Sequence, residues 1–449
     1  MSKYSKEDII RMCDEEDVKF IRLQFTDIAG QPKNVAIVRS SLESVLDNGM
    51  MFDGSSIEGF VKIDESDMYL KPDLDTFVIY PRRSQHGKVA RFICDVYTPA
   101  GEPFEGDPRG ILKRVVKKAA DMGYTVNIGN ECEFFLFHTD EDGYPTENVN
   151  DTAGYFDLAP VDLAVDCRRE ICLALEKMGY VIEASHHEVA PGQHEIDFKY
   201  EDAVTTADYV VTFRTTVKTI AKKYGLHATF MPKPKFGING SGMHTNMSLM
   251  TKKDGKTVNA FYDPEDPNGL ELSSVAYSYI EGVLTHVKAI TAITNPLVNS
   301  YKRLVPDYEA PCYIAWSASN RSDIIRIPAS RGMGTRCELR SPDPSTNPYL
   351  CLACCIAAGL DGIEKNMKIR DSVDINLFAS TQEERDALGV DNLPGSLDAA
   401  IKAMDKDPLV KDVLGNHAYN CFKKMKKVEW DAFRMSISQW ELDNYLFAY

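Results

Sequence analysis

The sequence lacks the features that mark secreted, membrane-spanning and thiolate–metal proteins. Residues 1–8 contain no apolar segment, so we expect no signal peptide. The apolar run at residues 350–360 is too short to cross a bilayer, which needs about 20 apolar residues. The chain has 11 cysteines, and those in this run have no second pair that would complete a metal site. We interpret Cys351, Cys354 and Cys355 as buried packing residues, and we expect a reducing, cytoplasmic setting.

Basic residues are in the minority. There are 51 Lys and Arg against 67 Asp and Glu, which gives a formal net charge of −16. A surface of that sign disfavours nucleic acid and anionic membranes as direct partners. Residues 301–345 reverse the balance, with seven basic and five acidic residues, and this segment suits an anionic substrate. Its basic side chains are Lys302, Arg303, Arg321, Arg326, Arg331, Arg336 and Arg340.

The chain also lacks a Gly-x-x-x-x-Gly-Lys-Ser/Thr phosphate loop, a protein-kinase signature, internal repeats and low-complexity segments. With 449 residues, 44% hydrophobic and 26% charged, it has the composition of a soluble globular protein of two or three domains. A turn-rich stretch at residues 97–103 precedes Asp107 and Pro108, a pair typical of a helix start. We therefore expect a domain boundary near residue 105.

Hydrophobic periodicity and turn residues predict a mixture of helices and strands. The expected strands are residues 18–25, 34–38, 76–80, 89–97, 125–137, 181–188, 193–198, 227–231, 242–249 and 324–340. The expected helices are residues 5–16, 108–122, 163–178, 205–224, 272–294 and 348–365, with a helical tail from about Ser396. The aromatic-rich residues 440–449 are predicted either to clasp a neighbouring subunit or to pack on their own domain.

Two glutamates lie two residues apart in the expected strand 125–137. Residues i and i+2 of a strand project from the same face, so Glu131 and Glu133 point the same way. Buried carboxylates are costly unless they have a cation, a shared proton or arginine partners. This pair therefore predicts a charged site on an apolar strand.

Three further segments add to the pair. Glu188 and Glu195 flank Pro191 and Gly192, which read as a hairpin turn that brings both acids onto adjacent strands. His244 follows a glycine-rich stretch at residues 239–243. Glu338 shares a strand face with Arg336 and Arg340. Taken singly, each has a plain alternative: a solvated strand face, a hydrogen-bonded core histidine or a same-face ion pair.

Taken together, the set predicts bound cations. Five carboxylates and one imidazole would repel one another without a cation, and oxygen-dominated ligands favour Mg²⁺ or Mn²⁺ over Zn²⁺. Two divalent ions flanked by arginines fit phosphoryl transfer. The residue pattern by itself leads to a metal-dependent enzyme acting on phosphate.

Several motifs carry a resemblance to a known family. Residues 52–60, 239–244, 302–311, 320–322, 325–328 and 338–344 resemble type I glutamine synthetase, in the shorter form typical of Gram-positive bacteria. The likeness covers essentially the whole chain, in order. It implies an α+β fold: a small N-terminal β-grasp-like domain (residues 1–105), then a large catalytic domain (residues 106–449) with a curved antiparallel sheet surrounded by helices.

The resemblance implies a nitrogen-assimilating ligase. It joins ammonia to L-glutamate with ATP, through γ-glutamyl phosphate, and releases L-glutamine, ADP and phosphate. Two or more Mg²⁺ or Mn²⁺ ions are implied, one on Glu133, Glu188 and Glu195 and the other, beside the ATP phosphates, on Glu131, His244 and Glu338. The implied glutamate contacts are Asn239, Gly240, Arg303, Glu309, Arg321 and Arg340, and the implied nucleotide contacts are Glu183, Ser248, Arg326 and Arg336.

The resemblance also implies an ammonium pocket and a shared active site. Asp53 would deprotonate ammonium, in a pocket completed by Ser56, Tyr155, Glu188 and Glu309, and the implied catalytic residues are Asp53, Glu309 and Arg321. Glu309 would sit on a flap that excludes water. The family assembles as a dodecamer of two hexameric rings, with each active site between two subunits. Some relatives also bind transcription regulators, so nitrogen-responsive regulators are a candidate partner class.

Three positions depart from the family pattern. Asp307 stands where glycine is expected beside the flap, and Lys62 stands where arginine is usual in a region linked to feedback inhibition by glutamine. Residues 392–394 lack the tyrosine that the longer branch adenylylates, so we predict no such control. Two rival readings are a γ-glutamyl ligase for a larger amine, which retention of Asp53, Ser56 and Tyr155 disfavours, and a metal-stabilised scaffold without turnover.

Overall fold

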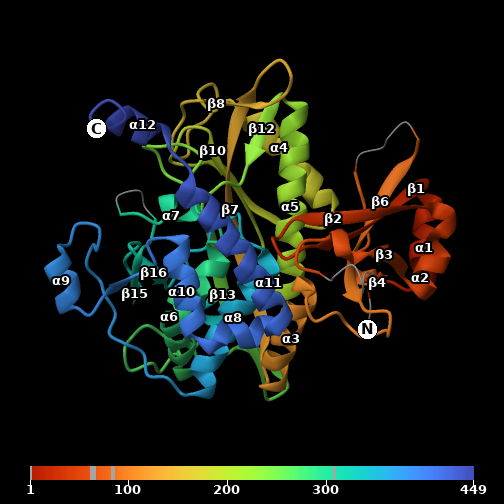
Figure 1. The fold of residues 1–449 in the computed structure, drawn as a ribbon. Coiled ribbons are helices and arrows are strands. Elements are labelled where there is room, and N and C mark those ends of the chain that lie inside the picture. Colours follow the sequence, from red (N-terminus) through yellow and green to blue (C-terminus); the bar gives the residue numbers. More distant parts are fainter. Residues whose placement is uncertain (1–2, 61–66, 82–85, 307–309) are drawn as a thin grey trace.

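The computed structural model describes residues 3–60, 67–81, 86–306 and 310–449. Lys62, Asp307 and Glu309 lie outside the described residues. Figure 1 shows a small N-terminal lobe, in red and orange, beside a much larger body that holds the rest of the chain. The α+β fold class predicted from the sequence is confirmed.

The N-terminal lobe is built on one mixed sheet. Its strands lie in the order β2-β1-β6-β4-β3, and β5 pairs with β6. The pair β1–β6 is parallel, whereas β1–β2, β3–β4 and β4–β6 are antiparallel. The strands are β1 (Val18–Thr26), β2 (Pro32–Val38), β3 (Met50–Asp53), β4 (Asp67–Pro72), β5 (Val78–Ile79) and β6 (Lys88–Tyr97). The helices are α1 (Lys6–Glu15) and α2 (Leu42–Asn48).

The body is built on a second, larger sheet. Its strands lie in the order β18-β15-β16-β17-β13-β7-β10-β9, with the long strand β7 also pairing with β8, β11 and β12. The pairing is antiparallel except between β15 and β16. The strands are β7 (Thr125–Thr139), β8 (Pro145–Val149), β9 (Ile182–His187), β10 (Gln193–Phe198), β11 (Glu201–Asp202), β12 (Leu226–Thr229), β13 (Met243–Lys253), β14 (Lys256–Asn259), β15 (Tyr313–Ser317), β16 (Asp323–Arg326), β17 (Cys337–Leu339) and β18 (Asp391–Asn392).

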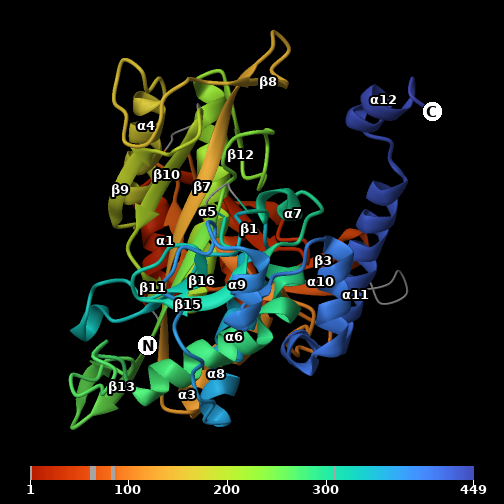
Figure 2. The same ribbon diagram turned by 90° about the vertical axis from the view of Figure 1, so that its left-hand side faces the viewer.

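Helices cover this sheet and form the core beneath it. They are α3 (Pro108–Asp121), α4 (Val165–Lys177), α5 (Ala203–Lys223), α6 (Ser274–Thr294), α7 (Ser300–Arg303), α8 (Pro348–Glu364), α9 (Gln382–Ala387), α10 (Leu397–Lys406), α11 (Pro408–Met435) and α12 (Gln439–Tyr445). The helix α8 packs against both α6 and α3, and all three gather at the base of the molecule in both ribbon views (Figures 1 and 2). No helix in the described parts of the chain is both long enough and apolar enough to cross a membrane.

Glycine lets α6 and α8 approach closely. A Cβ atom on Gly282 would overlap the carbonyl oxygen of Ala358, and one on Gly362 would overlap that of Ser278. Because the backbones touch here, only glycine fits at these positions. The cysteines of α8 (Cys351, Cys354 and Cys355) are fully buried in this core, so the prediction that they are packing residues is confirmed.

A buried arginine joins the two lobes. Arg109, at the start of α3, donates to both carboxylate oxygens of Asp208 on α5, at 3.0 and 2.9 Å. The same guanidinium donates to Asp95 (2.7 Å) and Asp73 (2.9 Å), which belong to the N-terminal lobe. A buried guanidinium that meets three carboxylates is satisfied only while the lobes keep this arrangement, so this contact orients the N-terminal sheet on the body.

Three expectations from the sequence need correction. The predicted strand at residues 324–340 is two short strands, β16 and β17, because Pro328 and the glycines at 332 and 334 interrupt the ladder. The edge strand β3 and its neighbour β4 were not predicted. The C-terminal residues do not pack on their own domain: Phe447 and Tyr449 are fully exposed, and α12 lies at the tip of the molecule beyond α11 in both ribbon views (Figures 1 and 2).

Candidate active site

Three antiparallel strands bring the predicted acids together. Glu195 on β10 lies opposite Glu133 on β7, and on the other side of β7 Glu131 lies opposite His244 on β13. The hairpin β9–β10, with its turn around Gly192, adds Glu188 directly after β9. The predicted pairing of the two strands of this hairpin is confirmed. The two-residue period of each strand turns the charged side chains to one face of the sheet.

The first cluster is formed by Glu131, His244 and Glu338. One ligand atom from each lies within 4.8 Å of the others. The His244 Nδ1 atom is 3.0 Å from Glu131 Oε2 and 3.5 Å from Glu338 Oε1. Burial alone raises the pKa of Glu131, but the hydrogen bond and charge of His244 outweigh burial and lower the pKa to about 2. Two carboxylates and one imidazole at this spacing can hold a divalent cation.

The second cluster differs from the predicted set by one residue. Ligand atoms of His186, Glu188 and Glu195 lie within 4.8 Å of one another. Glu133 faces Glu195 across the strand pair, and its Oε2 atom accepts hydrogen bonds from Gln193 Nε2 (2.7 Å) and Gly242 N (2.9 Å). The structure therefore groups two of the three predicted glutamates, Glu188 and Glu195, with His186, and places Glu133 opposite Glu195 on the neighbouring strand.

Mutual repulsion raises the pKa values of several of these acids. Burial, and then the neighbouring charges of Glu133 and Asp197, raise the pKa of Glu195 well above its usual value. Burial and the nearby Glu188 raise the pKa of Glu133. Burial and Glu131 raise the pKa of Asp197 to about 7. A bound cation would remove this repulsion, so the donor set fits a pair of oxygen-preferring divalent ions.

Arginines surround the first cluster. Arg326 Nη1 is 2.7 Å from one oxygen of the buried Glu338, and Arg340 contacts the other oxygen. Arg336 Nε donates to Asn246 Oδ1 (2.9 Å), and Asn246 Nδ2 donates to Glu131 Oε1 (3.0 Å). These guanidinium groups provide the local positive charge that a phosphate group needs.

A cavity of about 290 Å³ adjoins this cluster. Three of the four predicted nucleotide contacts line it: Glu183 from β9, Ser248 from β13 and Arg336. Glu131 and Asn246 line it as well. His244, Asn246 and Ser248 alternate along β13, so one face of this strand runs from the metal-binding cluster into the cavity.

The glycine-rich stretch at residues 239–242 packs against Arg303. A Cβ atom on Gly240 would overlap the Pro232 carbonyl oxygen, and one on Gly242 would lie 2.6 Å from Arg303 Nη2. Arg303 itself is buried, and its guanidinium donates to the carbonyl oxygens of Ser341 (2.7 Å), Pro342 (3.3 Å) and Arg340 (3.2 Å). Burial lowers its pKa. In this structure Arg303 therefore holds the backbone that carries Arg340.

The candidate ammonium pocket is only partly assembled within one chain. Burial and the charges of Glu188 and Glu195 raise the pKa of Tyr155, and Arg321 opposes them, so these four side chains lie near one another. Asp53 and Ser56 are exposed and belong to the N-terminal lobe, and Figure 1 shows β3, which ends at Asp53, on the side of this lobe away from β7, β10 and β13. Hydrogen bonds from the hydroxyl and backbone amide of Ser55 lower the pKa of Asp53.

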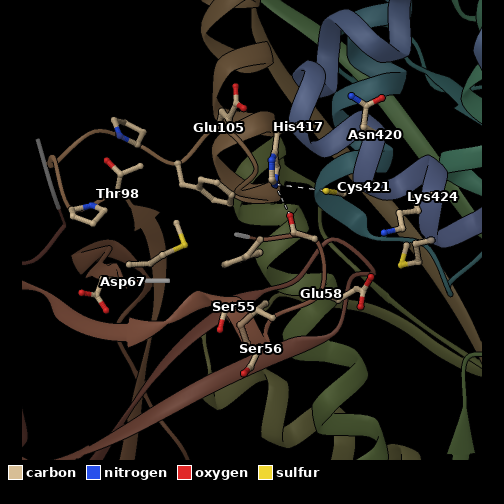
Figure 3. A pocket seen from close by; sticks show the side chains of 18 of the residues that line it. Ser55, Ser56, Glu58, Asp67, Thr98, Glu105, His417, Asn420, Cys421 and Lys424 are labelled. Atoms are coloured by element: carbon tan, nitrogen blue, oxygen red, sulfur yellow. Dashed lines mark hydrogen bonds between the residues drawn. The ribbon is translucent and has the colours of Figure 1, made fainter. Parts of the chain in front are cut away.

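The loop that carries Asp53 and Ser56 borders a cavity with a volume of about 1580 Å³ (Figure 3). The cavity lies between this loop and α11. His417 of α11 has its Nε2 atom 2.8 Å from the Gly59 carbonyl oxygen and 3.8 Å from the sulfur of Cys421 (Figure 3). This contact links the loop to the body of the same chain.

Comparisons with known proteins agree with this geometry. The description "Glutamine synthetase, catalytic domain" matches residues 105–445, and "Glutamine synthetase, beta-Grasp domain" matches residues 17–99. The chain belongs to the glutamine synthetase family. It is 61% identical to a glutamine synthetase of Clostridium saccharobutylicum over 449 residues, with 100% of both chains covered. It is 58% identical to a glutamine synthetase of Staphylococcus aureus over 447 residues, with 99% of both chains covered.

Solved structures show the same fold. A structure of GmaS with ADP has a TM-score of 0.88 at 32% identity and covers 98% of this chain and 100% of its own. A glutamine synthetase of Plasmodium falciparum has a TM-score of 0.86 at 26% identity, with 99% of both chains covered. As a type I glutamine synthetase, the chain makes glutamine from glutamate and ammonia at the expense of ATP. The family uses divalent metal ions with ATP, and the two clusters are the candidate metal sites.

Sequence reasoning missed four polar residues of the site: His186, Gln193, Asp197 and Asn246. The spacing of these residues in the sequence could have identified them. Each lies two residues from a predicted ligand on the same strand or its direct continuation, as His186 does from Glu188 and Asp197 does from Glu195. The two-residue period that linked Glu131 to Glu133 would therefore have found them.

Proposed function

We propose that the two clusters hold Mg²⁺ or Mn²⁺ ions, one ion on Glu133, Glu188 and Glu195 and the other on Glu131, His244 and Glu338. The observation that carries the proposal is the close spacing of the ligand atoms. Those of Glu131, His244 and Glu338 lie within 4.8 Å of one another, and so do those of His186, Glu188 and Glu195, while Glu133 faces Glu195 across the strand pair. Carboxylate oxygens dominate both groups, and the cysteines of the described residues lie elsewhere, in the core or on helices, so the donor chemistry favours these ions over Zn²⁺.

The nucleotide would occupy the cavity beside the first cluster, with Glu183, Ser248 and Arg336 as contacts. When bound, the cations supply charge neutralisation at the phosphate oxygens. Arg326 and Arg340 already lie beside Glu338, and each can turn a donor to an incoming anion. We assign Arg326 to the phosphates and Arg340 to glutamate, because a planar guanidinium pairs with either anion through two hydrogen bonds.

Substrate glutamate would lie between the glycine-rich stretch and the arginines. Asn239, Gly240, Arg321 and Arg340 form its direct contacts in this proposal, and Arg303 acts through the backbone that it holds. The γ-carboxylate oxygen attacks the γ-phosphorus of ATP and ADP leaves, which gives γ-glutamyl phosphate. Arg321 stabilises the developing negative charge on the transferred phosphoryl group.

Ammonium would be bound by Asp53 and Ser56 from a neighbouring subunit, together with Tyr155 and Glu188 of this one. The Asp53 carboxylate takes one proton from NH₄⁺, and the lone pair of ammonia then attacks the acyl carbon and displaces phosphate. Its lowered pKa keeps Asp53 ionised near neutrality, as this role requires. We assign Glu309, which lies outside the described residues, to the flap that keeps water from the acyl phosphate.

An oligomer follows from the separation of Asp53 from the clusters of its own chain. We propose the family's dodecamer of two hexameric rings, with a β-grasp domain at residues 1–105, a catalytic domain at residues 106–449 and a cytoplasmic location. The exposed α12 supports a clasp on a neighbouring subunit. Nitrogen-responsive transcription regulators remain a proposed partner class.

The test measures Mn²⁺ binding and product formation together. Electron paramagnetic resonance of Mn²⁺ titrated into the purified protein is expected to count two sites per chain, and Glu195→Gln and Glu131→Gln are each expected to weaken one of them. Glutamine should form in step with phosphate release. One Mn²⁺ site that neither substitution affects would overturn the metal assignment, and phosphate release without glutamine would point to an acceptor other than ammonium.

A further inference from the structure

A buried polar network lies behind the metal-ligand hairpin. It contains Asp151, His187 and His194, all of which are buried, together with Asn150 and the ion pair of Arg168 with Asp162. None of these residues belongs to the two candidate metal clusters. Buried polar groups are costly unless their hydrogen bonds are satisfied, so a buried polar network is expected to have a structural or functional role.

Asp151 is the hub of this network. Its Oδ1 atom accepts from His187 Nε2 (2.9 Å) and from the backbone amide of Gly192 (3.0 Å). Its Oδ2 atom accepts from Asn150 Nδ2 (2.9 Å) and from the backbone amide of Leu163 (3.3 Å). One carboxylate thus holds the end of β9, the turn of the hairpin and the far end of the loop that carries Tyr155.

His187 connects Asp151 to the backbone of Glu188, a proposed metal ligand. Its Nδ1 atom donates to the backbone carbonyl of Glu188 at 2.6 Å, while its Nε2 atom is held by Asp151. Its own carbonyl accepts from the backbone amide of Phe156 at 3.1 Å, next to Tyr155. The peptide from which the Glu188 carboxylate projects is therefore fixed from behind by the imidazole.

The three buried residues could themselves be read as a metal site, since their donor atoms lie within 4.8 Å of one another. Their hydrogen bonds argue against this. His194 Nδ1 is 3.0 Å from Arg168 Nη1, and its other ring nitrogen is 3.3 Å from Asn150 Oδ1. A guanidinium that donates to the ring nitrogen occupies its lone pair and brings a positive charge where a cation would bind.

We propose that Asp151, acting through His187, is a positioning residue that sets the Glu188–Glu195 hairpin at the spacing a divalent cation requires. The proposal rests on the assignment of Glu188 and Glu195 as metal ligands. Outer residues that orient metal ligands change metal affinity by about 10–100-fold when they are replaced. A change at Asp151 should therefore weaken one metal site and leave the other, on Glu131, His244 and Glu338, unchanged.

Asp151→Asn is the main variant. An amide keeps the size of the side chain but has only one oxygen, so either the His187 and Gly192 pair or the Asn150 and Leu163 pair of donors loses its acceptor. Asp140→Asn is the matched control. Asp140 also accepts two backbone amides, at 3.1 and 2.8 Å, but in the exposed β7–β8 turn, away from both clusters.

Two substitutions at His187 test separately its hydrogen bond to Asp151 and its hydrogen bond to the Glu188 carbonyl. His187→Asn can place an amide nitrogen near the Nδ1 position and keep the bond to the Glu188 carbonyl, whereas His187→Gln can place one near the Nε2 position and keep the bond to Asp151. If the path runs from Asp151 through the ring to Glu188, both variants weaken the same Mn²⁺ site. These variants also keep the question testable if Asp151→Asn does not fold.

The experiment titrates Mn²⁺ into the full-length oligomer by electron paramagnetic resonance, without substrates, and records the thermal midpoint alongside. We expect a 10–100-fold loss of affinity at one of two Mn²⁺ sites in Asp151→Asn and no change in Asp140→Asn. A lower midpoint with both affinities unchanged would show a merely structural role and would overturn the proposal. Loss of a third Mn²⁺ site would also overturn it, in favour of metal binding at the network itself.

Glu195→Gln in the same titration separates this inference from the proposed function. If Glu195→Gln weakens one site and Asp151→Asn does not, only the positioning role fails. If neither variant changes Mn²⁺ binding, the assignment of Glu188 and Glu195 as metal ligands is wrong, and the positioning role that depends on it falls with it.

Discussion

Glu131 and His244 face each other across the β7–β13 strand pair, with Glu131 Oε2 3.0 Å from His244 Nδ1. The two groups share one hydrogen bond, and a divalent cation that takes the place of its proton would be bound by a carboxylate oxygen and a ring nitrogen. The contact also lowers the pKa of Glu131 to about 2, so the carboxylate is ionised throughout the physiological range.

Replacement of this pair should therefore impair phosphoryl transfer. Glu131→Gln and His244→Ala are each expected to reduce kcat/KM for ATP by roughly 100-fold or more, because a metal ion contributes several kcal/mol of charge stabilisation. Coupled assays of phosphate and glutamine at several Mg²⁺ concentrations measure the effect. Glu147→Gln, on the exposed strand β8, is the control and should behave as the parent protein does. An unchanged Mg²⁺ dependence in Glu131→Gln would contradict the assignment.

Gly240→Ala tests the close packing beside the glutamate contacts. The new methyl group would overlap the Pro232 carbonyl oxygen, so the backbone must shift at a cost of about 1–3 kcal/mol. We expect a lower thermal midpoint and a higher KM for glutamate. Gly395→Ala is the matched control, because a Cβ atom there meets no other atom within 4 Å and the backbone is not in the left-handed region. Equal midpoints for the two variants would show that the site relaxes freely.

Asp323 should make stability depend on pH. It is fully buried, Asn320 donates to its Oδ1 atom, and its Oδ2 atom has no hydrogen-bond partner. Burial raises its pKa to about 8. A raised pKa means that the folded protein holds a proton that the unfolded chain releases, so this contribution to stability falls as pH rises from about 4 to about 8.

Asp323→Asn removes that titration while keeping the oxygen that Asn320 contacts. Thermal midpoints measured between pH 5.5 and 8.5 should fall for the parent protein relative to the variant, and the gap should stop growing above about pH 8. Parallel curves for the two proteins would mean that Asp323 is ionised in the folded state over this range.

His417 is expected to tune ammonium binding from a distance. Its contact with the Gly59 carbonyl holds the loop of Asp53 and Ser56 against α11 (Figure 3). Loss of one such hydrogen bond is worth about 0.5–1.5 kcal/mol, so His417→Ala should raise the KM for ammonium by roughly 2–10-fold, with the KM values for glutamate and ATP unchanged. Asn420→Ala, which lines the same cavity, serves as the control. A parallel rise of all three KM values would point to a general loss of structure.

Periodicity and local capping predicted much of the fold. Three helices illustrate this. The first, α1, begins with a capping box formed by Ser5 and Asp8; α3 begins at Asp107 and Pro108; and α8 is long and apolar. All three depend on interactions within a few residues. The pairing of β9 with β10, which brings Glu188 near Glu195, followed from the turn at Gly192. Such features depend on local chemistry, which a sequence displays directly.

Other features depend on contacts between distant residues and could not be predicted in this way. The edge strand β3 is only four residues long and exists because β4 pairs with it. Arg303 carried the same charge signal as Arg321, yet it is buried on backbone carbonyls while Arg321 is exposed. The hub at Asp151 joins Gly192 and Leu163, which no spacing rule connects.

The central claim is that a complete active site takes Asp53 from one subunit and the acidic clusters from the next. Co-expression of Asp53→Ala chains with Glu131→Gln chains tests it most directly. Each variant alone should make almost no glutamine. In mixed oligomers, a site that combines the intact Asp53 of one chain with the intact Glu131 of its neighbour is complete, so we predict that glutamine synthesis returns to a measurable fraction of the parent rate. Mixed oligomers that stay as inactive as either variant alone would contradict the shared site.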